Sequence, residues 1–494
     1  MKFQSTRDSS AAKLTAAQVI KQGLAADGGL FVPESIPTLT KADIEALCKM
    51  DYPTRAATVL GKFLTDYTAE ELLCDCKAAY AEASFVGGAA PLHKLDDTMH
   101  VMELWHGPTA AFKDMALQIM PRLLSRALLK TGEERTALIL VATSGDTGKA
   151  ALEGYKDIDR IKMMVFYPVD GVSTVQKLQM QTQTGNNVNV TAIKGNFDDA
   201  QTGVKKIFSD TAVAAELDKK GYFLSSANSI NWGRLAPQIV YYVSAYCDLL
   251  TAGEIKYGDK INVTVPTGNF GNIFAAYLAK LMGLPIDRLV CASNKNNILT
   301  DFLTTGTYDR NRDFYLTMSP SMDILISSNL ERLLYFVAGA EKTADYMKQL
   351  ATKGAYTVDA ATKAAISESF LGYFADEAAT AQTIRTTMDR YGYLIDTHTA
   401  VAVSAAEQYL KDTGDKKPMV IASTASPYKF AADVYTSLYG EAPASPLAAL
   451  DALSEKTGVE ITYPLRGIGE RKVRFTNVVD AADMQNAMFE YLQQ

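Results

Sequence analysis

The chain has 494 residues, of which 48% are hydrophobic and 21% charged, a balance typical of a globular protein long enough for two to four domains. The formal net charge of −7 gives no basic field, which argues against nucleic acid and anionic membranes as partners and favours a small molecule. The five cysteines are too few and too scattered for a disulfide framework, so reduced thiols and no metal site are expected. The chain start lacks an apolar signal-like run, and no stretch is apolar over about 18 residues, so a cytoplasmic location is expected.

The first ninety or so residues are predicted to form an N-terminal domain without evident chemistry. Two stretches in it, 39–50 and 67–83, have helical periodicity. From residue 91 to about residue 440, short apolar runs rich in β-branched residues alternate with helical patterns. This alternation predicts a parallel sheet covered by helices, whereas the last fifty residues are less clearly patterned.

The stretch "HGPTAAFKDMALQ" (106–118) places Lys113 between an aromatic residue and an acid, at the predicted start of a helix. The helix macrodipole disfavours a lysine there, and the preceding Phe112 and small residues favour burial, which would lower its pKa. A desolvated lysine readily forms a Schiff base. The alternative is an ordinary solvated lysine. The following segment is amphipathic, and Pro121 is expected to kink or restart it.

Three units follow in which an apolar strand ends in Ser, Thr, Gly or Asn and passes directly into a helix. They lie at 137–155, 261–281 and 417–435. Backbone N–H groups at such a helix start favour an anion, and ligands of open α/β sheets sit beyond the carboxyl ends of the strands. The three loops are therefore expected to converge on one cleft. Well-capped helices without a ligand are the alternative.

The first of these loops, "ATSGDTGKA" (142–150), resembles a nucleotide phosphate loop but departs from that pattern twice. The pattern needs Gly where Thr143 stands and Ser or Thr where Ala150 stands, so an anion cradle rich in hydroxyl groups is predicted instead. Asp146 would repel a second anion unless it is paired or caps the helix, so an orienting or capping role is expected.

The second loop, "PTGNFGNIF", suits a phosphate group. Gly268 and Gly271 allow close backbone approach, while Asn269 and Asn272 supply side-chain donors at the helix start. It is not a dinucleotide fingerprint, because no G-x-G-x-x-G occurs in it.

The four histidines offer no recognisable nucleophile motif. His106 and His398 lie in suggestive surroundings, but none of the four has a Ser or Cys partner in such a motif. Packed or hydrogen-bonded structural roles are therefore favoured for them.

A lysine, a phosphate cradle and a second anion loop together suggest pyridoxal 5′-phosphate, whose aldehyde binds a lysine and whose phosphate needs such a cradle. The motifs "HGPTAAFKD", "TSGDTG", "NSINWGR" and "PTGNFGN", in this order, closely resemble the threonine synthase family, in its longer-chain branch of bacteria and fungi. The stretches "QGLAADGGLFVPE" and "DTHTAVA" also resemble that family, so the resemblance covers most of the chain.

This resemblance implies an α/β fold of the tryptophan synthase β-like type (pyridoxal phosphate fold type II), with two open parallel-type subdomains and an additional N-terminal domain. The domains implied are an N-terminal one at 1–90, a cofactor-binding catalytic core at 91–440 with a smaller subdomain at about 128–220, and a C-terminal region at 441–494. The implied reaction converts O-phospho-L-homoserine and water to L-threonine and phosphate by γ-elimination and β-addition of water, the last step of threonine biosynthesis. The smaller subdomain is expected to close over the substrate.

The motifs also transfer roles to single residues. Lys113 would be the Schiff-base lysine, and Arg234 in "NSINWGR" is expected to hold the substrate phosphate, unless it forms a structural ion pair. The cofactor-binding residues implied are Lys113, Phe112, Gly268, Asn269, Phe270, Gly271, Asn272 and Thr424, with Ser423 competing with Thr424 for the pyridine nitrogen. The substrate-binding residues implied are Thr143, Ser144, Gly145, Asp146, Thr147, Asn228, Ser229 and Arg234. Ser426 stands where many relatives have a histidine.

Two other functions are open. A serine or threonine dehydratase of the same fold would use the same lysine and cradle but would not need the second phosphate-binding group. A non-catalytic relative would lack the lysine or the cradle, and both are present. The sequence makes no prediction of oligomeric state.

Overall fold

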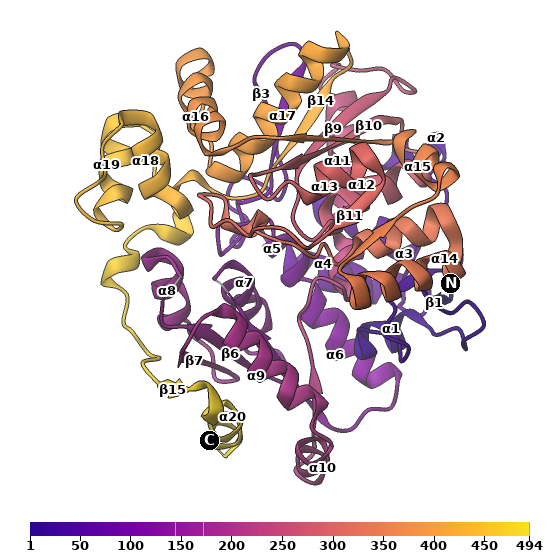
Figure 1. Cartoon of the computed structure of the whole chain (residues 1–494), viewed down its shortest axis with the longest axis vertical. Coiled ribbons are helices and arrows are strands. Elements are labelled where there is room, and N and C mark those ends of the chain that lie inside the picture. The colour runs from indigo at the N-terminus through magenta and orange to yellow at the C-terminus, as the bar shows by residue number, and fades with distance from the viewer. Residues whose placement is uncertain (144, 171, 494) are drawn as a thin grey trace.

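Two separate, mainly parallel sheets form the framework of the protein (Figure 1). The computed structural model describes residues 1–143, 145–170 and 172–493. The larger sheet has the strand order β13-β10-β9-β14-β4-β3, and only its β3–β4 pair is antiparallel. The smaller sheet has the order β15-β7-β6-β5-β8 and is parallel throughout. The predicted α/β fold class with two parallel-type sheets is confirmed.

The strands of both sheets are short and mostly buried, as parallel strands covered on both faces by helices must be. The larger sheet contains β3 (Leu92–Lys94), β4 (Met99–Glu103), β9 (Ile261–Pro266), β10 (Ile286–Ser293), β13 (Phe370–Phe374) and β14 (Met419–Ser423). The smaller sheet contains β5 (Thr136–Ala142), β6 (Ile161–Pro168), β7 (Val188–Lys194), β8 (Tyr222–Ser225) and β15 (Val478–Asp480). Every residue of β9 and β14 is buried, so these neighbouring strands lie at the centre of the larger unit.

The helices follow the alternation expected from the sequence. The larger sheet is accompanied by α11 (Trp232–Thr251), α12 (Gly271–Leu281), α13 (Ile298–Thr305), α14 (Leu330–Lys353), α15 (Ala360–Ser367), α16 (Glu377–Tyr391), α17 (Thr397–Thr413), α18 (Ala431–Tyr439) and α19 (Ala448–Thr457), with the small hairpin β11 (Thr307–Asp309) and β12 (Ala355–Thr357). The smaller sheet is accompanied by α7 (Asp146–Tyr155), α8 (Thr174–Gln181), α9 (Phe197–Ser209), α10 (Thr211–Lys219) and α20 (Met484–Leu492). Short 3-10 helices are η1 (Pro320–Met322), η2 (Pro427–Phe430), η3 (Tyr463–Leu465), η4 (Ile468–Glu470) and η5 (Ala481–Asp483).

The N-terminal elements are β1 (Phe3–Ser5), α1 (Ala16–Gln22), β2 (Phe31–Pro33), α2 (Lys41–Leu47), α3 (Tyr52–Gly61) and α4 (Ala69–Ala79). Capping boxes at Thr15, Thr40 and Thr68 explain where α1, α2 and α4 begin. The two predicted helices of this region are therefore confirmed, although each is shorter than its periodic stretch. The side chain of Arg55 joins this region to α11 through Asp248 at 2.6 Å.

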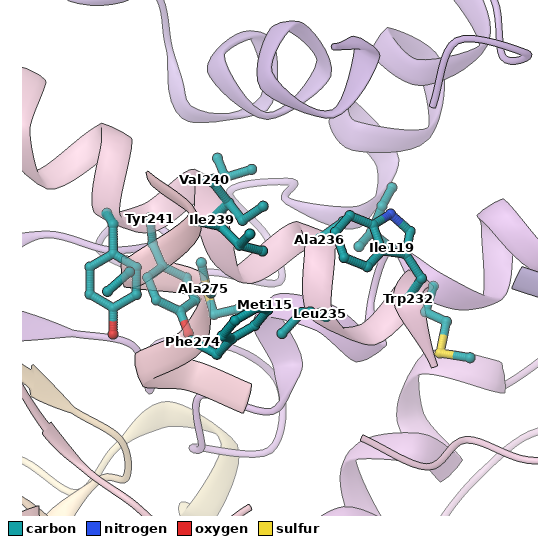
Figure 2. Packing of buried hydrophobic residues seen from close by; sticks show 14 of the residues in the cluster. Met115, Ile119, Trp232, Leu235, Ala236, Ile239, Val240, Tyr241, Phe274 and Ala275 are labelled. Carbon is teal, nitrogen blue, oxygen red and sulfur yellow. The ribbon is translucent and has the colours of Figure 1, made fainter. Parts of the chain in front are cut away.

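The segment after Lys113 forms two helices, α5 (Asp114–Leu117) and α6 (Met120–Lys130), and Pro121 lies in the first turn of α6. The predicted restart at Pro121 is confirmed. Met115 of α5 packs in one apolar cluster with Leu235 and Ile239 of α11 and with Phe274 of α12 (Figure 2). This packing fixes the position of α5, and hence of the lysine that precedes it.

The end of the chain returns to the smaller sheet. Beyond α19 the chain runs down to β15, which pairs with β7, and α20 packs on the apolar cluster beneath that sheet (Figure 1, yellow). The domain boundaries predicted from the sequence are not tested by this arrangement and stay a prediction. Within the described ranges, no helix is long and apolar enough to cross a membrane. The five cysteines are free.

Candidate active site

Lys113 lies where the carboxyl end of β14 meets the start of α5. The N–H of Phe112 donates to the Thr424 carbonyl at 2.8 Å, which holds this segment against the end of the strand. Lys113 itself immediately precedes α5 and is 9% exposed, so the predicted burial of this lysine is confirmed.

The Lys113 amine pairs with the carboxylate of Asp146. Its Nζ atom lies 3.4 Å from Asp146 Oδ2 and 3.3 Å from Ser321 Oγ. Burial lowers the pKa of Lys113, the like charges of Lys429 and Arg234 lower it further, and Asp146 opposes them. Lys113 is thus an amine that gives up its proton more easily than a lysine in water.

Asp146 is the centre of the charge arrangement. Its Oδ1 atom accepts from Gln176 at 2.7 Å and pairs with Lys429 at 3.0 Å, while its Oδ2 atom faces Lys113 and Ser321. Burial alone would raise the pKa of Asp146, but the two lysines hold it well below its usual range. None of its hydrogen bonds in the described residues goes to the backbone of α7. The geometry therefore agrees with the orienting alternative and not with helix capping.

Ser321 connects this carboxylate to a buried histidine. The N–H of Ser321, in η1, donates to His398 Nε2 at 3.1 Å, and His398 Nδ1 lies 2.8 Å from Asp396 Oδ2. Because Nε2 accepts this hydrogen bond, Nδ1 carries the hydrogen and donates it to Asp396 Oδ2. His398 has a hydrogen-bonded structural role, as favoured from the sequence, but it acts on a residue that touches Lys113. Sequence reasoning assigned no role to Ser321, Lys429 or Asp396. Asp396 begins the motif "DTHTAVA" and Lys429 lies in the third loop, but the motifs do not indicate which residues they contact.

The loop between β9 and α12 has the cradle shape expected of it. Phe270 takes the left-handed conformation (φ 63°), and a Cβ atom on Gly268 would lie 2.7 Å from the Ser321 carbonyl oxygen. The first N–H group bonded within the helix is that of Phe274, which donates to Phe270 at 3.0 Å. The preceding N–H groups, from Gly271 on, have no backbone partner in the described residues and are available to an anion.

Residues outside the loop hold the cradle in place. Ser327 Oγ donates to the Gly268 carbonyl at 2.7 Å, and Asn329 Nδ2 donates to the Asn269 carbonyl at 3.0 Å. The buried guanidinium of Arg332 donates to the Asn329 side chain. The loop is therefore supported from the start of α14, a connection that its sequence does not reveal.

The side-chain amide of Asn272 is held by two tyrosines. Its Oδ1 atom accepts from the Tyr241 hydroxyl at 2.8 Å and from the Tyr242 hydroxyl. Burial raises the pKa of both tyrosines well above the usual value, so both remain donors. The Asn272 Nδ2 atom is buried without a hydrogen-bond partner among the described residues. A buried donor of this kind is costly unless a ligand satisfies it.

Arg234, near the start of α11, is a buried cation with no carboxylate partner among the residues that the structure describes. One guanidinium nitrogen donates to the Ala227 carbonyl at 2.5 Å, and Nε is buried without a partner in the described part of the chain. Burial lowers the pKa of Arg234 to about 10, so it stays charged at neutral pH. The structural ion pair considered from the sequence is absent from the described residues. Asn228 is exposed, Ser229 is half-buried, and their side chains contact each other at 3.4 Å.

The end of β14 presents two adjacent hydroxyl groups. Ser423 Oγ accepts from Trp105 Nε1 at 3.0 Å and lies 2.9 Å from Thr399 Oγ1, so it is fully engaged. The Thr424 hydroxyl makes no hydrogen bond with the described residues. Thr424 is therefore the better placed of the two to meet a ring nitrogen. Ser426 contacts the Thr462 hydroxyl at 2.5 Å, away from this pair.

The loop after β5 is organised by Thr143. Its Oγ1 atom accepts from the N–H groups of Gly145 and Gly148, both at 3.0 Å, and Gly145 has φ 138°. Thr147 is half-buried and makes no side-chain hydrogen bond among the described residues. Ser144 lies outside the described residues. The turn leaves Asp146 pointing at the lysines.

The three loops belong to two sheets and not to one. The first loop follows β5, a strand of the smaller sheet. The second and third loops follow β9 and β14, which are neighbouring strands of the larger sheet. They still meet, because Asp146 pairs with Lys429 of the third loop, and Ser321 bridges Asp146 and Gly268. The loops are thus in contact with one another, while a cleft between them stays a prediction. The third loop enters η2 before α18 and not an α-helix directly.

Other candidate residues have structural roles. Lys149, which stands at the lysine position of a nucleotide phosphate loop, pairs with Glu153 at 3.0 Å. His106 binds Glu103 at 2.6 Å, and His93 stacks on Tyr393.

Together these groups fit pyridoxal phosphate. A buried lysine of lowered pKa can hold an aldehyde, a glycine cradle with an unpartnered Asn272 donor can hold a phosphate, and the free Thr424 hydroxyl can meet a ring nitrogen.

Comparison with known proteins agrees with this fit. Residues 2–80 match the family model for the threonine synthase N terminus, residues 84–425 that for pyridoxal-phosphate dependent enzymes, and residues 399–486 that for the threonine synthase C-terminal region. Threonine synthase of Pseudomonas aeruginosa is 39% identical over 456 residues, covering 91% of this chain and 93% of that protein. The human protein threonine synthase-like 1 is 40% identical over 433 residues, covering 85% of this chain, and the match spans only 58% of the human protein.

Solved structures extend the likeness to the whole chain. The structure of threonine synthase with bound pyridoxal phosphate from Brucella melitensis superposes with a TM-score of 0.87 at 37% identity, covering 100% of this chain and 99% of that one. The chain belongs to the threonine synthase family of pyridoxal-phosphate-dependent enzymes.

Proposed function

We propose that this protein is a threonine synthase, which converts O-phospho-L-homoserine and water to L-threonine and phosphate. The observation that carries the proposal is Arg234, a buried guanidinium that stays charged and has no carboxylate partner among the described residues. A dehydratase of the same fold has no phosphate on its substrate and would not need such a group. Arginine binds phosphate through two parallel hydrogen bonds, which fits this second, separate anion site.

The residues that would hold the cofactor are Lys113 for its aldehyde, the 268–272 loop for its phosphate and Thr424 for its ring nitrogen. When bound, pyridoxal phosphate supplies an electron sink for negative charge on the substrate carbons next to the amine. Phe112 contributes by fixing Lys113 to the end of β14 through its backbone.

Lys113 would carry the proton transfers. Its lowered pKa makes the amine easier to deprotonate than a lysine in water, and in the free form its Nζ atom can take a proton from Cα and then one from Cβ. Phosphate leaves from Cγ, which gains the proton taken from Cβ. Water adds its hydroxyl group at Cβ, its remaining proton goes to the released phosphate, and the proton taken from Cα returns to Cα. Overall one hydrogen passes from Cβ to Cγ, so atoms and charge balance between substrate and products.

The anion-binding residues would align these steps. Arg234 would hold the phosphate group, with Asn228 and Ser229 as further candidates, while the 143–147 loop would face the substrate carboxylate. Holding both ends fixes the breaking bond relative to the cofactor ring, which is where positioning contributes most to rate. Asp146 would orient the Lys113 amine through its Oδ2 atom.

The test is phosphate release and threonine formation from O-phospho-L-homoserine. The wild type is expected to form both products in equal amounts and Lys113→Ala to form neither. Arg234→Met is expected to raise the KM for the phosphorylated substrate at least tenfold while leaving cofactor absorbance intact. A yellow protein that forms neither product but deaminates serine or threonine would overturn the proposal in favour of the dehydratase.

We also propose a cytoplasmic location and the domain division 1–90, 91–440 and 441–494. Cell fractionation tests the first. Limited proteolysis, with cuts near residues 90 and 440, tests the second.

A further inference from the structure

Lys429 is a second buried lysine at the site, and the proposed function gives it no role. Its side chain is 0% exposed, its Nζ atom donates to the Thr109 carbonyl at 2.8 Å, and it pairs with Asp146 Oδ1 at 3.0 Å. It comes from η2, in the loop that follows β14. Lys429 thus reaches the same carboxylate as Lys113 from the other side.

The two lysines are held unequally. Lys429 makes two close contacts, whereas Lys113 lies 3.4 Å from Asp146 and 3.3 Å from Ser321. Each lysine faces a different oxygen of Asp146, so neither displaces the other. Lys429 is therefore held by shorter contacts than Lys113.

Charge explains why two lysines are needed. A buried carboxylate left without a cation is strongly destabilising. With Lys113 as its only partner, Asp146 would lose that partner whenever Lys113 became neutral. The other charged or titratable groups facing this cluster are Arg234 from α11, His398 from α17, Asp114 from α5 and Lys149 from α7, and none of them forms an ion pair with Asp146.

We propose that Lys429 is a positioning residue that serves as the permanent counter-ion of Asp146, so that Lys113 can give up its proton without leaving the buried carboxylate unpaired. The inference rests on the proposed function, in which Lys113 must be neutral during part of each turnover.

The test uses cofactor-free protein and no substrate, so its outcome is separate from that of the activity assay. The rate at which cyanate modifies Lys113 is followed by mass spectrometry as a function of pH, because only the free amine reacts. In Lys429→Met, Lys113 becomes the sole partner of Asp146, and we expect its profile to move to higher pH, with about tenfold slower modification below the midpoint. In Asp146→Asn, the profile is expected to move to lower pH.

Opposite shifts of the Lys113 pH profile in Lys429→Met and Asp146→Asn indicate an electrostatic role. A merely structural role would shift the profile in the same direction in both variants. Lys429→Arg keeps the charge and is expected to restore the wild-type profile. Lys149→Met removes another buried lysine, paired to Glu153, and is expected to leave the profile unchanged. An unshifted profile in Lys429→Met overturns the proposal. If that variant does not fold, Asp146→Asn decides, and a profile that fails to move to lower pH overturns it.

Discussion

Gly268→Ala probes how tightly the phosphate cradle is packed against η1. The added Cβ atom would lie 2.7 Å from the Ser321 carbonyl oxygen and 3.5 Å from Met322 Cα. Both are backbone atoms, so a rotating side chain cannot relieve the overlap, and the loop or η1 must shift. Overpacking of this kind costs about 1–3 kcal/mol. Because Ser321 also contacts Lys113, the shift would disturb the amine as well.

Gly271→Ala is the matched control three residues further on. Its Cβ atom would lie 3.4 Å from Asn329 Nδ2, an ordinary contact with a side chain. Replacing glycine there restricts the unfolded chain and is expected to be neutral or to stabilise by about 0.4–1 kcal/mol. Thermal unfolding of the two cofactor-free variants measures the difference. Equal midpoints would refute the close packing of Gly268 against η1.

Three further predictions concern the support of the site. Tyr241→Phe combined with Tyr242→Phe removes both donors that orient the Asn272 amide, so cofactor affinity in an absorbance titration is expected to fall about tenfold. Tyr246→Phe, on the same helix, is the control. Equal cofactor affinities of the double variant and the control would contradict the orienting role. Burial raises the pKa of Asp114 to about 6. Between about pH 4 and about pH 6 the folded protein therefore keeps a proton on Asp114 that the unfolded chain has released. As pH rises through this window, the free energy of unfolding is expected to fall. Asp114→Asn should flatten urea midpoints across that window, and an unchanged slope would argue against the shift. His398→Ala removes the acceptor of the η1 N–H and should lower kcat more than it raises KM; a change in KM alone would count against a role near Lys113.

The local chemistry of the site could be predicted from the sequence because it lies within short units. The cradle at 268–272 and the turn that presents Asp146 are each formed by one loop between a strand and a helix. Lys113 is likewise marked by its neighbours, small residues before it and an apolar helix after it. Each of these features is indicated by glycines, helix starts and apolar runs that lie within about ten residues of it.

Contacts between distant segments could not be predicted from one sequence. Lys429 is far from Asp146 along the chain, and no local pattern distinguishes it from a solvated lysine. Ser321 lies in a segment without periodicity, yet it joins His398 to the amine. The division of the loops between two sheets was implied by the family resemblance and not by the strand pattern, since strand alternation predicts parallel pairing but not which strands pair.

The late pairing of β15 with β7 gives the smaller sheet an unusual dependence on chain synthesis. Its other four strands lie between residues 136 and 225, but the fifth comes from 478–480, and α20 after it belongs to the same apolar cluster as Met164 and Phe166 of β6. Until residues 478–492 have been synthesised, β7 is an open sheet edge and its apolar cluster lacks α20. An unpaired edge of this kind can pair with strands of other chains. A fragment that ends before residue 478 lacks β15 and α20 and should therefore aggregate. A chain purified through a tag placed after residue 494 contains every strand of the smaller sheet.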